Sequence, residues 1–395
     1  MAQPTDIVII VSNHHRWDMM FNNGCQLAYT PNFDALAAAG TSFRRAATVF
    51  PEAENAYASL VSGAYPNGDA GAFAASAMGT MLAGRDFEVV EVAARQQLLA
   101  TVEAAGAAIA APVDGSRVLL IRLPAIWSFE DIPERCFAPY RGNGVPLATY
   151  FAAVTAYDDA IGEMLSAIDG TGRRQSTLVI YTSLSGEQFK ARDFVNHANT
   201  LHADSIRVPL ILSWPELTSG GAVSDAFVSH VDLYATLASC TGSDLPTTGV
   251  NLLDCGRASR PGEEQRQGIY LYNHHQRHID FVFKDGSTDF VIFPPWVQRG
   301  LWTGRYKLIL SDDGGICRFF DLQIDPEEEF NLFAVPQGTS QGLLDQFTSR
   351  RTAIVSVAEQ LAAEARRLGD NLGVELAGRV ISDPTYGSNP TYERI

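Results

Sequence analysis

Two histidines near the start of the chain have the chemistry of a general base. His14 and His15, preceded by Asn13, follow directly on the apolar run 7–11. An imidazole titrates near neutral pH, so it can take up and release a proton during a reaction. Neighbouring side chains of an extended segment point to opposite faces. His14 or His15 could serve as the base; of the two we favour His14, and we expect Asn13 and His15 to bind substrate.

The segment 51–66 carries the side chains that could assist such a base. It reads Pro-Glu-Ala-Glu-Asn-Ala-Tyr-Ala-Ser-Leu-Val-Ser-Gly-Ala-Tyr-Pro. Glu54 or Glu52 could orient the histidine, or act as the acid if desolvation raises its pKa. Tyr57 could donate a hydrogen bond to a developing oxyanion, and Asn55 could bind substrate. A surface or helix-capping role stays open for each of these residues.

Other polar residues are expected to bind substrate, and one belongs to a histidine-rich run. The additional substrate-binding candidates are Gln96, Ser185, His197 and His274. His274 lies in the run 273–278, which has three histidines in five positions. In a helix, His274 and His278 would share a face and could hold a soft metal. Apart from Asp280, no cysteine or carboxylate lies close by at ligand spacing, so a solvated loop is favoured.

The composition limits the classes of partner. The chain has 395 residues and a formal net charge of −16. Nucleic acids and anionic membranes attract basic surfaces, so we expect neither as a partner, whereas a small-molecule ligand is compatible with a locally positive pocket. No apolar run has the length of a membrane span, and the first residues read as a strand and not as a signal peptide. Five scattered cysteines without CxxC spacing predict reduced thiols in a cytoplasmic protein.

Alternating strand and helix patterns predict an α/β domain with a large, mostly parallel sheet flanked by helices. The candidate strands are apolar at consecutive positions, which is typical of strands covered on both faces. They span residues 7–11, 89–92, 117–123, 178–182 and 208–214. The candidate helices between them span residues 32–39, 58–62, 147–169 and 231–240.

A polar stretch at 252–267 is interpreted as the linker into a second, smaller domain. We expect domains at 1–260 and 261–395. Short strands with turn signals predict an antiparallel sheet in the second domain, at 269–273, 280–283, 289–292, 301–302, 306–310 and 317–321. A terminal helix over 342–368 is expected to pack on this sheet through an apolar stripe. That stripe consists of Ile354, Ala358, Leu361, Ala365 and Leu368.

Seven segments in order resemble motifs of the sulfatase family in the alkaline-phosphatase superfamily. Residues 51–66 resemble the signature Cys/Ser-x-Pro-x-Arg-x-Ser-Leu-Leu-Thr-Gly-x-Tyr-Pro. Six more motifs have counterparts at 30–37, 150–162, 205–215, 228–233, 303–309 and 325–332. This resemblance covers residues 6 to about 335 and implies an alkaline-phosphatase/sulfatase-like fold.

The residues that carry the family's reaction are replaced in this chain. The resemblance places the formylglycine nucleophile at Ala53, whose methyl group has no lone pair with which to attack. The metal ligands fall on Asn13 and His14, and on Leu184 and Ser185. The arginine that holds the nucleophile falls on Tyr57, and a catalytic histidine falls near Gln96. A hard divalent cation needs anionic oxygen ligands, so we expect no metal and no cofactor.

Two readings of the altered site stay open. In the first, the protein is a repurposed, metal-independent enzyme that performs acid–base chemistry on a small molecule. A cyclase, isomerase or esterase in the biosynthesis of secondary metabolites would be of this kind. The mostly polar replacements favour this reading, because a decayed site would more often fill with small apolar residues. In the second, it is a catalytically inactive pseudoenzyme that binds a ligand or a partner. A homodimer, or pairing with another protein, is compatible with both readings.

Overall fold

The chain forms two compact units. The computed structural model describes residues 4–65, 87–93, 97–112, 115–126, 132–142, 144–189, 200–218, 220–243, 248–255, 266–275, 278–282, 288–292, 296–312, 317–333 and 341–383. The first unit comprises Met1–Thr48, Glu52–Gln188 and Asp204–Gln265, and the second comprises Val49–Pro51, Phe189–Ala203 and Arg266–Ile395. The predicted domain boundary at residues 260 and 261 lies outside the described residues.

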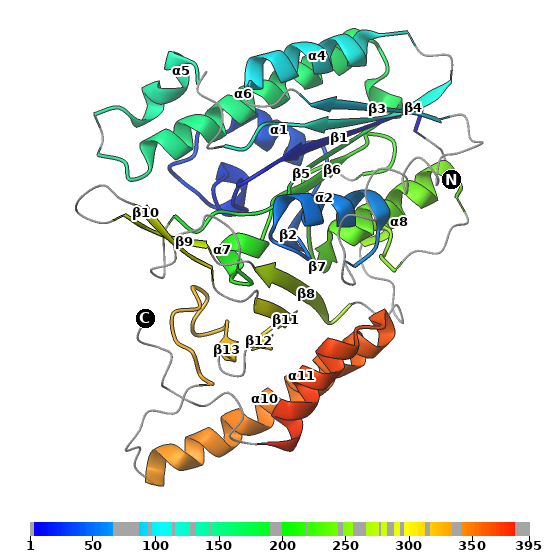
Figure 1. Cartoon of the computed structure of the whole chain (residues 1–395). Coiled ribbons are helices and arrows are strands. Elements are labelled where there is room, and N and C mark those ends of the chain that lie inside the picture. Colours follow the sequence, from blue (N-terminus) through cyan, green and yellow to red (C-terminus); the bar gives the residue numbers. More distant parts are fainter. Residues whose placement is uncertain are drawn as a thin grey trace. The chain divides into compact units, whose positions relative to one another are not determined.

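A seven-stranded mixed sheet forms the centre of the first unit (Figure 1). In spatial order its strands are β3 (Phe87–Ala93), β4 (Ser116–Arg122), β1 (Asp6–Ser12), β5 (Thr177–Ser183), β6 (Leu210–Ser213), β2 (Thr41–Ala47) and β7 (Ala222–Ser229). Only β6 runs antiparallel to its neighbours; the other pairs, including β1 with β4 and β5, are parallel. The prediction of a mostly parallel sheet is confirmed.

Helices cover both faces of this sheet. The helices α1 (Pro31–Ala38), α4 (Leu98–Ala110) and α6 (Ala148–Gly170) lie on one face, and α2 (Ala53–Ser62) and α8 (His230–Thr241) lie on the other (Figure 1). Short helices are α5 (Glu134–Phe137), α7 (Ala203–Ile206) and α9 (Leu252–Cys255), with 3-10 turns at Phe21–Asn23, Ala138–Tyr140 and Arg174–Ser176. No helix in the described part of the chain has both the length and the apolarity of a bilayer span.

The central strand shows why the sequence reveals some strands and conceals others. All seven residues of β1 are buried, because Ile7, Ile9 and Val11 pack beneath α2 and α8 while the alternate residues face the other helices. The resulting apolar run was visible in the sequence. The strands β2 and β7 were not predicted, because charged residues such as Arg44 interrupt them where they are exposed.

The second unit is built on antiparallel strands. Its four-stranded sheet has the order β13 (Arg318–Asp321), β12 (Tyr306–Ser311), β11 (Trp296–Thr303) and β8 (Gly268–His275). A separate pair consists of β9 (His278–Val282) and β10 (Thr288–Ile292). The helices α10 (Gln341–Leu368) and α11 (Asn371–Ser382) pack on each other and against the four-stranded sheet. The predicted antiparallel sheet with a terminal helix is confirmed.

Details of the second unit correct the sequence analysis. His274 is an exposed residue of β8, paired in register with Val297, and His278 begins β9. Residues 273–275 and His278 therefore lie in strands, and not in the helix considered for a metal site or in a solvated loop, whereas residues 276 and 277 lie outside the described residues. The predicted stripe on α10 is buried at Ile354, Ala358, Leu361 and Ala365. Helix α11 was not predicted; Asp370 caps it by accepting a hydrogen bond from Gly373 N.

Candidate active site

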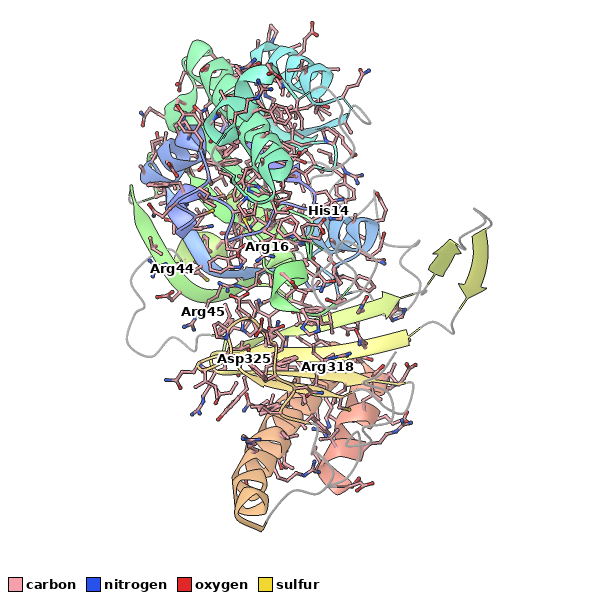
Figure 2. All side chains as sticks on the ribbon, turned by 90° about the vertical axis from the view of Figure 1, so that its left-hand side faces the viewer. His14, Arg16, Arg44, Arg45, Arg318 and Asp325 are labelled. Carbon is pink, nitrogen blue, oxygen red and sulfur yellow. The ribbon has the colours of Figure 1, made fainter. Side chains whose placement is uncertain are left out.

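Two loops of the first unit meet beyond the carboxyl ends of β1 and β5. In open α/β sheets, ligands bind in the crevice at this edge. Ser183 Oγ accepts a hydrogen bond from His15 N at 3.1 Å, and Ser185 Oγ donates to Asn13 Oδ1 at 3.0 Å. Arg16 Nη1 donates to the main-chain carbonyl oxygen of Glu187 at 3.3 Å. These bonds fix the two loops against each other, and Figure 2 labels His14 and Arg16 of the first loop.

His14 contacts a buried carboxylate across these loops. Its Nδ1 lies 3.3 Å from Glu187 Oε2. The Glu187 side chain is 0% exposed, whereas the His14 side chain is 21% exposed. A carboxylate at this distance from Nδ1 can orient an imidazole and favour a proton on that nitrogen over one on Nε2. This is the arrangement of a histidine base oriented by a carboxylate.

The backbone at His14 has a conformation that non-glycine residues rarely adopt. Its φ is 65°, in the left-handed region. The buried Tyr150 of α6 stabilises this turn from both sides: its hydroxyl donates to His14 O at 2.8 Å and accepts from Arg16 N at 3.0 Å. Burial raises the pKa of Tyr150, so its hydroxyl stays protonated and can donate. Strained residues of this kind concentrate at functional sites.

His15 has a structural environment. The residue is 0% exposed, and its Nδ1 lies 2.6 Å from the hydroxyl of Tyr181. Burial lowers the pKa of His15 to about 3, which keeps the imidazole neutral at physiological pH. The expectation that His15 binds substrate does not fit this burial, because no ligand can reach the ring without opening the core.

Glu54 and Tyr57 belong to a second group of side chains, around Arg122. Arg122 is the last residue of β4; its Nη2 lies 3.0 Å from Glu54 Oε1, and its guanidinium lies 4.0 Å from the centre of the Tyr57 ring. Burial and the neighbouring Glu91, which accepts a hydrogen bond from the phenol, raise the pKa of Tyr57. Glu52 caps α2 by accepting hydrogen bonds from Glu54 N and Asn55 N, at 3.2 and 3.0 Å.

The predicted site residues are thus distributed over distinct places. Asn13, His14 and Ser185 lie in the two loops beyond β1 and β5, and Ser185 is buried. Asn55 lies in the first turn of α2. Gln96 and His197 lie outside the described residues, and His274 belongs to the second unit.

Sequence reasoning gave no role to Arg122 or Tyr150 and did not recognise the partner of His14. Arg122 was detectable as a charged residue that directly follows the apolar run 118–121. Glu187 had a similar signal, because it follows the buried run 177–183 by four residues. Nothing in the sequence indicated that the Tyr150 hydroxyl would support the turn at His14.

The side chains at the family's metal-ligand positions do not fit a hard divalent cation. Leu184 belongs to the apolar core, and the Oδ1 of Asn13 already accepts a hydrogen bond from Ser185. Across the residues that the structure describes, no three His, Cys, Asp or Glu side chains are grouped as metal ligands. Neutral groups supply too little negative charge to offset the dehydration of calcium or magnesium. At the nucleophile position, Ala53 is the first residue of α2.

Comparisons with known proteins agree with the motifs. A family model described as Sulfatase matches residues 114–243, and one described as N-sulphoglucosamine sulphohydrolase, C-terminal, matches residues 197–352. Arylsulfatase K of Bos taurus is 30% identical over 205 residues, which cover 50% of this chain and 35% of that protein. The multifunctional alkaline phosphatase superfamily protein PehA of Trinickia caryophylli is 26% identical over 201 residues, covering 48% of this chain and 36% of the relative. The matches thus span little more than a third of the length of these curated relatives.

Solved structures share the fold over almost the whole chain. A sulfatase structure from work on glycosaminoglycan metabolism by Bacteroides thetaiotaomicron superposes with a TM-score of 0.76 at 17% identity, covering 97% of this chain and 99% of that one. A phosphonate monoester hydrolase of Agrobacterium radiobacter superposes with a TM-score of 0.63 at 15% identity, covering 91% of this chain and 96% of that one. Fold, ordered motifs and family models agree, and this chain belongs to the sulfatase family of the alkaline-phosphatase superfamily.

Proposed function

We propose that this sulfatase-family protein is a metal-independent enzyme that performs acid–base chemistry on a small molecule, with His14 as the general base. The observation that carries this proposal is the contact between the partly exposed His14 and the fully buried carboxylate of Glu187. A buried carboxylate is retained only when it is well partnered, and a histidine beside it gains a fixed tautomer and orientation.

In this proposal each residue around the site has a separate task. His14 Nε2 takes a proton from the ligand, or from a water that attacks it, and returns the proton to the leaving or rearranged group. Glu187 stabilises the imidazolium that forms in between. Tyr150 and Arg16 act as positioning residues, because they hold the main chain of His14 and of Glu187. An esterase, isomerase or cyclase acting in cytoplasmic secondary metabolism would need these steps and no metal.

A panel of chromogenic esters tests this function. Wild-type protein and His14→Gln are assayed with 4-nitrophenyl acetate, phosphate and sulfate, each with and without EDTA. Acetate hydrolysis should exceed the buffer rate, resist EDTA and fall about 100-fold in His14→Gln, the lower range for loss of a general base. Hydrolysis of the sulfate ester that disappears with EDTA would contradict the proposal.

A catalytically inactive, ligand-binding protein is the second candidate, and a specific observation favours it. The nucleophile position is Ala53, and the side chain at one metal-ligand position, Leu184, is part of the core. This candidate predicts stabilisation by a ligand without any turnover. One solved structure with this fold was determined with D-glucosamine-2-N,6-O-disulfate as its substrate, so this sugar and unsulfated glucosamine form a suitable pair for thermal-shift measurements.

A further inference from the structure

Arg122 supplies a positive charge at the same sheet edge as His14. It is the final residue of β4, which lies beside β1, and it pairs in register with Val11. Neighbouring strands lie about 5 Å apart, and His14 follows Val11 by only three residues. The side chain of Arg122 lies on the face of the sheet that α2 covers, because its guanidinium stacks over the Tyr57 ring at 4.0 Å. Such stacking fixes the planar group while its edge still offers hydrogen-bond donors.

The carboxylate that neutralises Arg122 is the most exposed member of this group. Glu54 lies 3.0 Å from Arg122 Nη2, and its side chain is 73% exposed, against 26% for Arg122. Glu91 is farther away, at 3.9 Å from Nη1, and it also accepts a hydrogen bond from Tyr57. Exposed ion pairs contribute little to stability. Breaking the pair between Glu54 and the Arg122 guanidinium therefore costs little free energy.

We propose that Arg122 forms an oxyanion subsite and that Glu54 occupies it as an internal carboxylate until a ligand displaces it. The ligand class is a small molecule with a carboxylate, phosphate or sulfate group, each of which matches the two-pronged geometry of a guanidinium. The catalytic side of this inference rests on the proposed function of His14, because the bound anion would hold the ligand beside that base. In this assignment Glu54 is a competitor of the ligand and not the catalytic acid that the sequence predicted.

Two substitutions with opposite expected signs test the subsite. Glu54→Gln removes the internal competitor and should tighten anion binding about two- to fivefold, the range that an exposed ion pair implies. Arg122→Gln should abolish saturable binding, and Arg122→Lys should restore part of it without the two-pronged geometry. Arg135→Gln is the matched control, because Arg135 forms a comparable exposed pair with Asp159 on α5 and α6. The backbone amide signals of Asn55 and Tyr57 report binding of sodium acetate, phosphate and sulfate at constant ionic strength.

Acetate, phosphate and sulfate represent the three candidate ligand groups, a carboxylate, a phosphate and a sulfate. The anion that binds most tightly identifies the group that the subsite prefers. Equal affinities in wild type and Glu54→Gln, retained binding in Arg122→Gln, or no saturable binding in any variant would overturn the subsite. Arg122→Lys is the control for misfolding of Arg122→Gln, because it keeps the positive charge and the aliphatic part of the side chain over Tyr57. The His14→Gln variant separates the two proposals: it should bind the anions like wild type. If its ester hydrolysis is also unchanged, the proposed base is wrong while the subsite stands.

Discussion

At the scale of single residues, the hydroxyl group of Tyr150 maintains the main-chain turn at His14. Tyr150→Phe removes the group that joins His14 O and Arg16 N. Unfolding free energy should fall by about 1–3 kcal/mol, because a buried carbonyl and a buried amide lose their partner. Ester hydrolysis that depends on His14 should fall as well, since the turn relaxes. Chemical denaturation and the acetate assay measure the two effects, with Tyr29→Phe, at an exposed tyrosine, as control. Unchanged turnover in a destabilised Tyr150→Phe would restrict Tyr150 to a structural role.

Buried neutral histidines make the protein sensitive to acid. Burial lowers the pKa of His15 to about 3 and that of His230 to about 4, both below the usual value of 6.5. At pH values below 6.5 and above these lowered pKa values, the two histidines are protonated in the unfolded chain but neutral in the folded chain. The unfolded chain therefore binds more protons, and the free energy of unfolding must fall as the pH drops below about 6.5. Urea denaturation at pH 7, 6, 5 and 4 measures this slope, and His15→Gln should flatten it. A variant with the same slope as wild type would contradict the assignment of His15 as buried and neutral.

At the scale of elements, one arginine connects β1, β4 and α4. Arg117 Nε contacts Asp6 Oδ1 at 3.0 Å, and its other nitrogens donate to the carbonyls of Ala108, Ile109 and Ala111 at the C-terminal end of α4. This contact satisfies carbonyls that the helix leaves unpaired and complements its dipole.

Arg117→Met should lower the unfolding free energy by about 3–5 kcal/mol, because it leaves Asp6 buried with a single cation, Arg173. Arg135→Gln, at an exposed pair, should change it by less than about 1 kcal/mol. Thermal and chemical denaturation of both variants gives the comparison. Equal effects would show that burial does not determine the contribution of these pairs.

The elements also show what the sequence could and could not predict. Strands buried on both faces, such as β1 and β5, and the long helix α6 produced periodic patterns that fixed their positions. The first turn of α2 was missed because its start depends on the Glu52 carboxylate, which binds two amides of that turn. Helix α7 and the strand assignment of His274 depend on tertiary pairing, which no local pattern encodes. The sequence identified candidate site residues such as His14 because they directly follow a recognisable strand. It could not identify Tyr150 as a partner of His14, because Tyr150 lies in a helix more than a hundred positions further along the chain.

At the scale of the whole molecule, the second unit contains a buried charged cluster that predicts a second acid transition. Lys307 and His202 both contact Glu328, and none of the three is exposed. Burial alone would raise the pKa of Glu328, but the charge of Lys307 and the contact with His202 outweigh it and lower the pKa to about 2. Stability from this carboxylate is complete above the unfolded value near 4.5 and is lost as the pH falls toward 2. Glu328→Gln should remove that loss, measured by acid titration with near-ultraviolet circular dichroism, with Glu327→Gln as control.

The metal-free character of the molecule is a further prediction at this scale. Titration with calcium or magnesium should leave the thermal transition unchanged, and elemental analysis after such exposure should give well under one equivalent. The physical reason is that Asn13, His14, Leu184 and Ser185 carry no anionic oxygen. A bound ion that stabilises the protein in proportion to its concentration would contradict this prediction.

A double-mutant cycle between His14 and Glu187 tests the central claim most directly. Turnover of 4-nitrophenyl acetate is measured in EDTA for wild type, His14→Gln, Glu187→Gln and the double variant. If Glu187 acts only through His14, both single variants lose activity and the double variant is no slower than His14→Gln. Additive losses, or a Glu187→Gln variant with wild-type turnover, would show that the two side chains do not work as a pair.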